Sequence, residues 1–431
     1  MRTLKASDEG FAKSFRKLVN SRRDGDIEVS RDVADIIADV RSRGDAALVE
    51  YSMRFDDHRL AVEGEDGWSI SLADCKVAYE ALEPDLRDAL DLAAKRIRAY
   101  HEGQLPEDRD YRDDDGIRLG ARWSAVDAAG LYVPGGRAAY PSSLLMNAIP
   151  AKVAGVERIA VVTPTRKGEA NPLVLAAAHI AGVDKIWRIG GAQAVAALAY
   201  GTDRIKPVDV VTGPGNAWVA EAKRQLYGVV GIDMVAGPSE ILVIADADND
   251  PDWIAADLLS QAEHDPTSQS ILITDDGQFA ALVADAIDVQ CTQLSTAQTA
   301  RESVDTHGAI IVVETLDDAI PLANRLAAEH VELAVADPGA LFAKLRHAGS
   351  VFLGRMTPEA VGDYVAGPNH VLPTGRRARF SSGLSVLDFM KRTSFIGVDD
   401  DGLRKIGPAA AALAHAEGLP AHARSIEERL K

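Results

Sequence analysis

Cysteine is scarce in this chain, which contains only Cys75 and Cys291. Neither residue lies in a glycine-rich loop, near a histidine, or in a paired spacing. A disulfide framework and a cysteine-ligated zinc site are therefore both disfavoured. A catalytic thiol is disfavoured as well, and a buried or incidental role is the better interpretation of both cysteines.

Long hydrophobic runs and positive charge are also lacking. No stretch of about 18 apolar residues occurs, so no membrane span is predicted. The segment Met1 to Asp8 has no apolar signal region, which predicts a cytoplasmic protein. Lys and Arg number 47 against 65 Asp and Glu, and the formal net charge is −18. Nucleic acid is disfavoured as a partner, because phosphate binding needs clustered Lys and Arg.

The length of 431 residues is too great for one ordinary core, so two to four domains are expected. Residues 1 to about 125 are predicted to be mainly helical. From Gly130 onward, short β-branched runs alternate with alanine-rich helical runs. The predicted strands are 131–133, 158–162, 185–189, 208–211, 241–245, 270–274, 310–313 and 350–353. This alternation predicts an α/β fold with two successive parallel-sheet units.

After about Gly367 the alternation stops. A turn-rich segment followed by helices is predicted there, with Ala409 to Leu413 as one helical core. Such a tail is short for an independent domain, so we expect it to pack on something else, such as another subunit.

Four glycine-containing loops each follow a predicted strand. They lie at residues 134–136, 190–193, 213–216 and 237–240. In three of them the strand leads toward a helix, which places the loop at the carboxyl edge of a sheet, where ligands bind. One such loop alone is more often a tight turn, but four together predict a ligand crevice. None has the Gly-x-Gly-x-x-Gly pattern, so a standard dinucleotide site is not indicated.

A possible metal site lies in the stretch Ser260 to Pro266. It closes a helical run that Pro266 would stop, and a helix would put Gln261 and His264 on one face. An amide oxygen beside a neutral imidazole forms half of a zinc or manganese site. Three downstream clusters are expected to converge on this stretch: Glu329-His330, Gly362-Asp363, and Glu417 with His422.

Non-catalytic interpretations of these residues stay open. His264 and His330 each follow a glutamate near the end of a predicted helical run, where a histidine can simply interact with the helix dipole. Asp363 and His422 are less specific still. No His-Glu-x-x-His occurs, so a zincin hydrolase is disfavoured.

Taken together, these residues resemble histidinol dehydrogenase over nearly the whole chain. The resemblance is densest in six stretches, which follow in this order: Gly130 to Pro150, Gly213 to Asn216, Asp233 to Glu240, Ser260 to Asp265, Glu329 to Leu333, and Gly362 to Thr374.

The resemblance implies an NAD-dependent, zinc-dependent oxidation of L-histidinol to L-histidine through L-histidinaldehyde, the last two steps of histidine biosynthesis. It implies one zinc per active site, bound by Gln261, His264, Asp363 and the partner's His422. Glu329 and His330 are the implied acid–base pair, in which His330 takes the hydroxyl proton and Glu329 activates the water that hydrates the aldehyde.

The same resemblance implies further binding residues. The substrate would also contact the residues Ser239, His370 and Glu417, and NAD would contact Tyr132, Gln193 and Asn216. The implied fold has two incomplete Rossmann-like domains and a homodimer with shared active sites. Its implied segments are 1–27 (helical extension), 28–127 with 238–376 (metal-site domain), 128–237 (NAD domain) and 377–431 (segment reaching the partner).

Two other functions remain as alternatives. Relatives that oxidise other amino or sulfo alcohols share the metal residues. The stretch Gly367 to His370 together with Glu417 favours histidinol, because a carboxylate suits the substrate amine and would repel a sulfonate. A non-catalytic α/β protein that binds a small anion is the third interpretation, and it would leave the polar clusters without a role.

Overall fold

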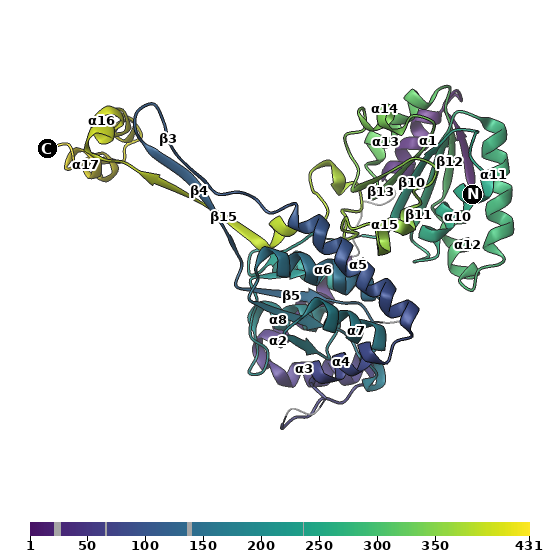
Figure 1. The fold of residues 1–431 in the computed structure, drawn as a ribbon, viewed down its shortest axis with the longest axis horizontal. Coiled ribbons are helices and arrows are strands. Elements are labelled where there is room, and N and C mark those ends of the chain that lie inside the picture. The colour runs from purple at the N-terminus through teal and green to yellow at the C-terminus, as the bar shows by residue number, and fades with distance from the viewer. Residues whose placement is uncertain (21–26, 65–66, 136–139, 236) are drawn as a thin grey trace.

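The computed structural model of the chain describes residues 1–20, 27–64, 67–135, 140–235 and 237–431. In these residues two six-stranded sheets are each covered by helices, and a third sheet has three strands. Figure 1 shows the two covered sheets as separate bodies, with the three-stranded sheet reaching away from both toward the C-terminal helices.

We name the sheet with the candidate metal residues the β10 sheet. All of its neighbouring strands are parallel. In spatial order they are β1 (Arg2–Lys5), β12 (Ala309–Val312), β11 (Gln269–Thr274), β10 (Glu240–Ala245), β13 (His330–Ala334) and β14 (Ser350–Leu353). One face packs on α1 (Phe11–Asn20), α13 (Leu316–Leu326) and α14 (Pro338–Phe342). The other packs on α10 (Pro251–Ala262), α11 (Gly277–Cys291) and α12 (Ala297–Thr306).

The second body is built on what we name the β5 sheet. Its spatial order is β2 (Ser69–Ile70), β7 (Lys185–Trp187), β6 (Arg158–Val162), β5 (Ala128–Tyr132), β8 (Val210–Thr212) and β9 (Gly231–Ile232). Only β2 runs antiparallel to its neighbour among these described strands. One face packs on α4 (Leu72–Glu80), α5 (Pro84–Glu102), α6 (Pro141–Ala154) and α7 (Pro172–Ala181). The other packs on α2 (Ile27–Arg43), α3 (Asp45–Asp56), α8 (Gly191–Tyr200) and α9 (Ala217–Leu226).

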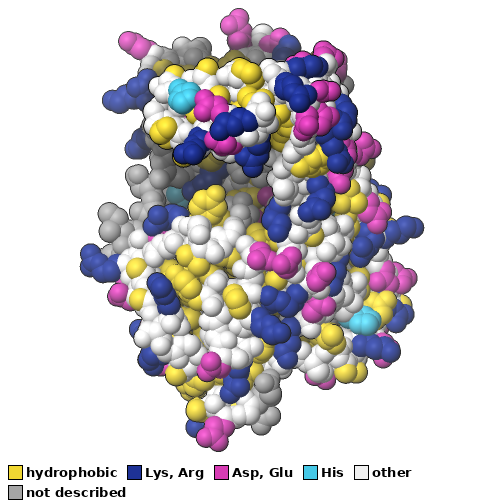
Figure 2. Space-filling model, turned by 90° about the vertical axis from the view of Figure 1, so that its left-hand side faces the viewer, with side chains coloured by type: hydrophobic (Ala, Val, Ile, Leu, Met, Phe, Trp, Pro, Cys, Tyr) yellow, Lys and Arg dark blue, Asp and Glu magenta, His cyan; other side chains and the backbone are white. Residues whose placement is uncertain are grey.

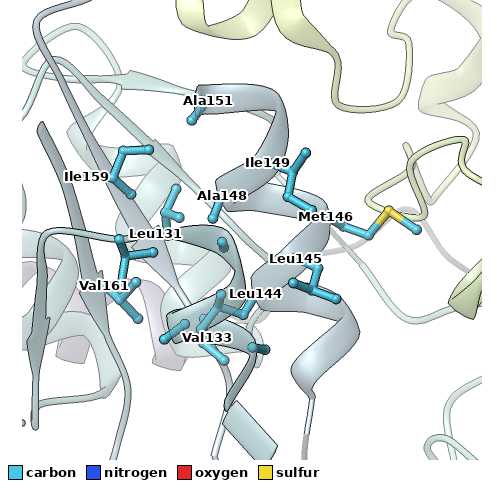
Figure 3. Packing of buried hydrophobic residues seen from close by; sticks show 14 of the residues in the cluster. Leu131, Val133, Leu144, Leu145, Met146, Ala148, Ile149, Ala151, Ile159 and Val161 are labelled. Atoms are coloured by element: carbon cyan, nitrogen blue, oxygen red, sulfur yellow. The ribbon is translucent and has the colours of Figure 1, made fainter. Parts of the chain in front are cut away.

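Successive residues of β6 show why this body is double-sided. Ile159 and Val161 join the cluster under α6, whereas Ala160 and Val162 join the cluster under α8. Side chains alternate across a strand, so a run that is apolar at every position requires cover on both faces. Figure 3 shows α6 lying along β5 and β6, with Leu144 and Ala148 directed toward the strands.

The third sheet and two helices form what we name the arm. The sheet is antiparallel, with β15 (Met390–Gly397) beside β4 (Arg118–Ala125) and β4 beside β3 (Arg109–Arg112). Helices α16 (Asp400–Ala416) and α17 (Pro420–Glu427) lie at its far end (Figure 1). Only Ala411, Ala414 and Ala423 form a buried cluster in the described part of these two helices. So small a core is typical of an element that needs a larger surface to pack against.

Short elements complete the chain. They are α15 (Glu359–Tyr364) and the 3-10 turns η1 (Arg166–Gly168), η2 (Arg377–Arg379) and η3 (Val386–Phe389). No helix among the described residues is both long enough and apolar enough to cross a membrane. Cys75 and Cys291 are buried and unpaired, and burial raises the pKa of Cys75 to about 11, as the interpretation of these residues as non-catalytic requires.

The predicted grouping of N-terminal residues differs from this packing. Residues 28–127 were expected to join 238–376, but α2, α3, α4 and α5 cover the β5 sheet instead. Residues 1–27 were expected to be an extension, yet β1 pairs with β12 and α1 buries Phe15 and Leu18 against the β10 sheet. The apolar faces of these helices fit either sheet, so periodicity alone could not assign them.

The predicted α/β architecture with parallel sheets is confirmed, and each of the eight predicted strands overlaps an observed one. Three longer strands were missed. The first is β13, where His330 and Glu332 interrupt the apolar run. The others are β4 and β15, which pair with one another across a long sequence separation and expose much of their surface.

Candidate metal centre and active site

Helix α10 brings Gln261 to the centre of the site. The Asp250 side chain accepts a hydrogen bond from the Asp252 backbone N–H at the start of the helix, and Pro251 takes the first helical position. Gln261, in the last turn, is fully buried. The His264 backbone N–H donates to the Gln261 carbonyl at 3.3 Å, so the chain continues for one turn past the helix and leaves His264 exposed.

Glu329 and His330 lie at the amino edge of the β10 sheet. His330 is the first residue of β13, so the expectation that it ends a helical run is wrong: α13 stops at Leu326. Its Nδ1 lies 3.1 Å from the Glu240 carbonyl oxygen. Only a protonated Nδ1 can donate there, so neutral His330 carries its lone pair on Nε2. Glu329 Oε2 accepts from the Glu240 backbone N–H at 3.0 Å.

Helix α15 supplies two carboxyl groups. Oδ1 of Asp363 lies 3.8 Å from His330 Nε2, and Oε1 of Glu359 lies 3.5 Å from the same nitrogen. His370 follows in the next loop, with Nδ1 3.7 Å from Asp363 Oδ1. His330, Glu359 and Asp363 offer ligand atoms within 4.8 Å of one another, a spacing that fits a metal ion.

Three acids of this site were not predicted from the sequence: Glu359, Glu332 and Asp257. The Glu332 carboxyl group accepts from the Glu359 backbone N–H at 2.5 Å. Asp257 and Glu332 share a hydrogen bond that requires one of the two to be protonated, and burial raises the pKa of both. Ser260 Oγ donates to Glu359 at 3.1 Å.

Periodicity could have found these acids. Asp257 precedes Gln261 by one helical turn, Glu359 precedes Asp363 by one turn, and Glu332 follows His330 on the same strand face.

Burial dominates the electrostatics. It raises the pKa of Asp363 to about 8 and of Asp257 to about 6, and it raises the pKa of Glu329 well above its usual value. It lowers the pKa of His330 to about 4. Both effects have one cause, because a low-dielectric environment disfavours the charged form of any group. At neutral pH, therefore, the imidazole of His330 is neutral.

A divalent cation fits the unpartnered acceptor atoms of this site. Gln261 Oε1, His330 Nε2 and Glu359 Oε1 are buried and have no hydrogen-bond partner among the described residues. Such orphaned acceptors are costly unless something binds them. Imidazole, amide and carboxylate are ligands that zinc and manganese accept, and a cation would offset the buried carboxylates.

A second group of predicted residues lies at the carboxyl edge of the β5 sheet. Tyr132 ends β5 and is buried, and its hydroxyl oxygen accepts from the Gly191 backbone N–H at 3.1 Å. Gln193 in α8 is 1 % exposed, and its Nε2 has no partner among the described residues. Asn216 caps α9, where its Oδ1 accepts from the backbone N–H of Trp218. The sheet order reverses between β5 and β8, the position where ligands bind in open α/β sheets.

Three further predicted residues, Ser239, Glu417 and His422, lie outside the two groups described above. Ser239 directly precedes β10 and lies next to the Glu240 backbone that Glu329 and His330 contact. Glu417 and His422 are exposed on the arm, far along the long axis of the molecule from α15 (Figure 1). Within one chain, the structure does not bring these two residues to the other site residues.

The fold and this site define an α/β enzyme with a candidate metal centre. The histidinol dehydrogenase family profile matches residues 19–430. The histidinol dehydrogenase of Zymomonas mobilis subsp. mobilis is 64 % identical over 420 residues, which cover 97 % of each chain. That of Rhodospirillum rubrum is 60 % identical over 430 residues, covering 99 % of this chain and 98 % of the relative.

A solved structure is similar as well. The crystal structure of histidinol dehydrogenase from Elizabethkingia anophelis superposes with a TM-score of 0.93 at 34 % identity and covers 100 % of this chain and 98 % of that one. The chain belongs to the histidinol dehydrogenase family, NAD-dependent oxidoreductases that oxidise histidinol in histidine biosynthesis. This assignment removes the interpretation as a non-catalytic binding protein.

Proposed function

We propose that the chain oxidises L-histidinol to L-histidine in two steps through L-histidinaldehyde, with NAD and one zinc ion per active site. The observation that carries the proposal is the buried cluster around His330, in which three acceptor atoms have no partner among the described residues. An acid–base pair directly beside a candidate metal centre is what an alcohol oxidation followed by hydration of an aldehyde requires.

Zinc is proposed to bind Gln261, His264, Asp363 and the partner subunit's His422. Bound zinc would supply a Lewis acid that orients the histidinol imidazole and amine and acidifies the alcohol, and NAD would supply the hydride acceptor. His330 and Glu359 belong to the same group of potential ligands, but in this assignment both stay outside the zinc ligand set: His330 Nε2 is left for the substrate hydroxyl, and Glu359 Oε2 contacts Ser260.

His330 is proposed to accept the substrate hydroxyl proton at Nε2. Its Nδ1 donates to the Glu240 carbonyl, which fixes the ring and leaves Nε2 free to accept. Burial keeps this imidazole neutral at neutral pH, the protonation state that a base needs.

Glu329 is proposed to take a proton from the water that hydrates the aldehyde. The Glu240 backbone N–H holds one oxygen of its carboxyl group. Burial raises its pKa well above the usual value, so the carboxylate would be a stronger base than one in water. Ser239 and His370, together with Glu417 of the partner subunit, are proposed to hold the substrate.

NAD is proposed to bind at the carboxyl edge of the β5 sheet, in contact with Tyr132, Gln193 and Asn216. The unpartnered Nε2 of Gln193 offers a hydrogen-bond donor, and the amino end of α9 at Asn216 offers the positive end of a helix dipole. The parallel strands and the reversal of strand order support a Rossmann-like description of both bodies.

We also propose a homodimer in which the arms are exchanged. His422 and Glu417 cannot join Asp363 within one chain as it stands, and the arm has only a three-residue buried cluster of its own. Large apolar side chains remain exposed on the arm, including Ile396 (72 %) and Leu413 (65 %). Figure 2, which looks onto this end, shows hydrophobic side chains among charged ones. The cytoplasmic location stays a prediction.

The test is the NADH formed per L-histidinol consumed, with excess NAD and with zinc present or chelated. Two NADH per substrate, lost on chelation and regained with zinc, is the expected result. One NADH would remove the hydration role of Glu329. If only another amino or sulfo alcohol were oxidised, the substrate assignment would be wrong.

A further inference from the structure

A buried ion pair lies beneath the proposed NAD loop. The Nζ of Lys223 on α9 contacts Asp233 Oδ1, and the two side chains are 2 % and 0 % exposed. Asp233 follows β9 and opens the stretch Asp233 to Glu240, one of the densest in the family resemblance. Neither residue has a role in the proposed chemistry.

Both side chains hydrogen-bond to the backbone of the same glycine, Gly213. Asp233 Oδ2 accepts from the Gly213 backbone N–H at 2.8 Å, and Lys223 Nζ donates to the Gly213 carbonyl at 2.9 Å. Asp233 Oδ1 also accepts from the Met234 backbone N–H at 2.6 Å. Both polar atoms of the Gly213 backbone are therefore fixed by charged groups, which form stronger hydrogen bonds than neutral ones.

Gly213 is where the loop crosses the end of β5. Its φ is +112°, and a Cβ there would lie 2.1 Å from the carbonyl oxygen of Tyr132. Two residues on, a Cβ on Gly215 would lie 2.5 Å from Val219. Backbone at both points approaches its neighbours too closely for any side chain, so a small displacement of Gly213 would move the loop, with Asn216 at its end, relative to Tyr132.

A purely stabilising role explains the pair poorly. Burying two charges costs desolvation, and an apolar pair of similar volume is often equally stable or more so. An apolar pair could not, however, bond to the N–H and the carbonyl of Gly213. The arrangement therefore specifies a backbone position more than it adds stability.

We propose that Lys223 and Asp233 are positioning residues that hold the loop 213–216 in the geometry that binds NAD. This inference rests on the proposed NAD site and adds the two residues that position its loop. Neither side chain touches the cofactor, and the pair acts through Gly213.

The first variant is Asp233→Asn in the zinc-loaded enzyme. A carboxylate accepts from Gly213, Met234 and Lys223 at once, whereas an amide has one acceptor oxygen and turns an NH2 group toward donors. We expect the Kd for NADH, measured by fluorescence titration, to rise by about tenfold or more. Zinc content and the Kd for L-histidinol should stay at the wild-type values, and turnover at saturating NAD should fall by less than about threefold.

A second variant guards against simple unfolding, because Asp233→Asn leaves a buried lysine unpaired. The double variant Lys223→Met/Asp233→Asn has no unpaired charge, so it should unfold closer to the wild-type temperature while still binding NADH weakly. The matched control is Asp246→Asn. Asp246 also pairs with an arginine, Arg355 at 2.5 Å, and holds a backbone N–H, that of Ala336 at 2.9 Å, but it does so in the other body.

The outcomes separate the two proposals. If Gln193→Met weakens NADH binding but the double variant binds it as tightly as wild type, the positioning role is wrong and the NAD site stands. If neither changes the Kd although wild type binds NADH, the proposed NAD site itself is wrong. An equal loss of NADH binding in Asp246→Asn would mean that lowered stability, not loop position, caused the effect.

Discussion

At the scale of single residues, the site depends on one backbone unit, that of Glu240 at the start of β10. Its carbonyl orients His330 and its N–H holds Glu329, so the two proposed proton carriers are fixed to a central strand rather than to a loop. Burial then shifts their pKa values in opposite directions and leaves a neutral base beside a carboxyl group with a raised pKa. Opposed shifts of this kind are a physical signature of acid–base sites.

His330→Asn should separate binding from proton transfer. Asparagine keeps a polar side chain of smaller size but cannot accept the hydroxyl proton. We expect zinc content and L-histidinol binding to persist while turnover falls by about two to four orders of magnitude. Near-normal turnover in steady-state assays would contradict the role of His330 as the base.

Glu359→Gln should decide which carboxyl group binds the metal. In the proposed ligand set Asp363 is a ligand and Glu359 only supports it, so zinc affinity should fall by about 10- to 100-fold, as for other supporting residues. Zinc titration against a competing chelator measures this. Asp363→Asn is the comparison and should lose more affinity; the reverse order would make Glu359 the ligand.

At the scale of elements, the sequence was most informative where burial is simplest. Strands such as β6 and β10 lie between two helical layers and are apolar at nearly every position, so they were predicted correctly. β13 is equally buried but carries His330 and Glu332, whose polar side chains interrupt the apolar run and find their partners on β10 and α15.

The same reason limited the prediction of the site. The residue pattern indicated Gln261, His264, Glu329, His330 and Asp363 as a possible metal site but also fitted histidines at helix ends. Their specific roles, and His370 altogether, came through the resemblance. The supporting acids Asp257, Glu332 and Glu359 were missed, because an acid in sequence is normally a surface residue. Only the fold shows that one turn of α10 and one turn of α15 face the same strand.

The loop that carries His370 is fixed to α5 and α6, and its fixation should depend on pH. Asn369 Nδ2 lies 3.3 Å from His101 Nε2 and donates to the Met146 carbonyl at 2.6 Å. His101 Nδ1 donates to the Ile97 carbonyl, so Nε2 can accept from Asn369 only while the ring is neutral, and burial lowers the pKa of His101. As the pH falls, the unfolded chain therefore protonates His101 before the folded chain does. The contribution of His101 to the free energy of unfolding is present above about pH 6.5 and is lost as the pH falls below that value.

Melting curves from pH 7.5 to 5 test this. His101→Gln should be less stable than wild type at pH 7.5, by roughly 1–3 kcal/mol for the disrupted buried bonds, and should lose less stability on acidification. His179→Gln, at an exposed position on α7, is the control and should follow the wild-type curve. Parallel curves for wild type and His101→Gln would exclude His101 as the titrating group.

At the scale of the whole molecule, the arm is the feature that one chain leaves unexplained. Strand β4 is 8 residues long, so its sheet spans roughly 27 Å and places α16 and α17 away from both bodies (Figure 1). The two helices form a buried cluster of only three alanines, and they leave Glu417 and His422 exposed, away from the same chain's candidate metal centre. An exchanged arm in a two-fold dimer explains both observations, because each arm would then cover and complete the other subunit's centre.

Hybrid dimers test the exchange directly. A His422→Ala subunit lacks the zinc ligand on its arm but keeps the proposed base His330. A His330→Asn subunit lacks the base but keeps His422 on its arm. In a hybrid, one of the two sites combines the intact halves. Random subunit exchange makes about half of the dimers hybrids, so the mixture should regain about a quarter of wild-type activity although each variant alone is nearly inactive.

The control mixture is His330→Asn with Asp363→Asn. Both changes lie in the same body of the chain, so neither site of that hybrid is complete and no activity should return. If the first mixture stayed inactive while labelled subunits demonstrably exchanged, His422 would have to act within its own chain, and the arm would have to fold back onto it.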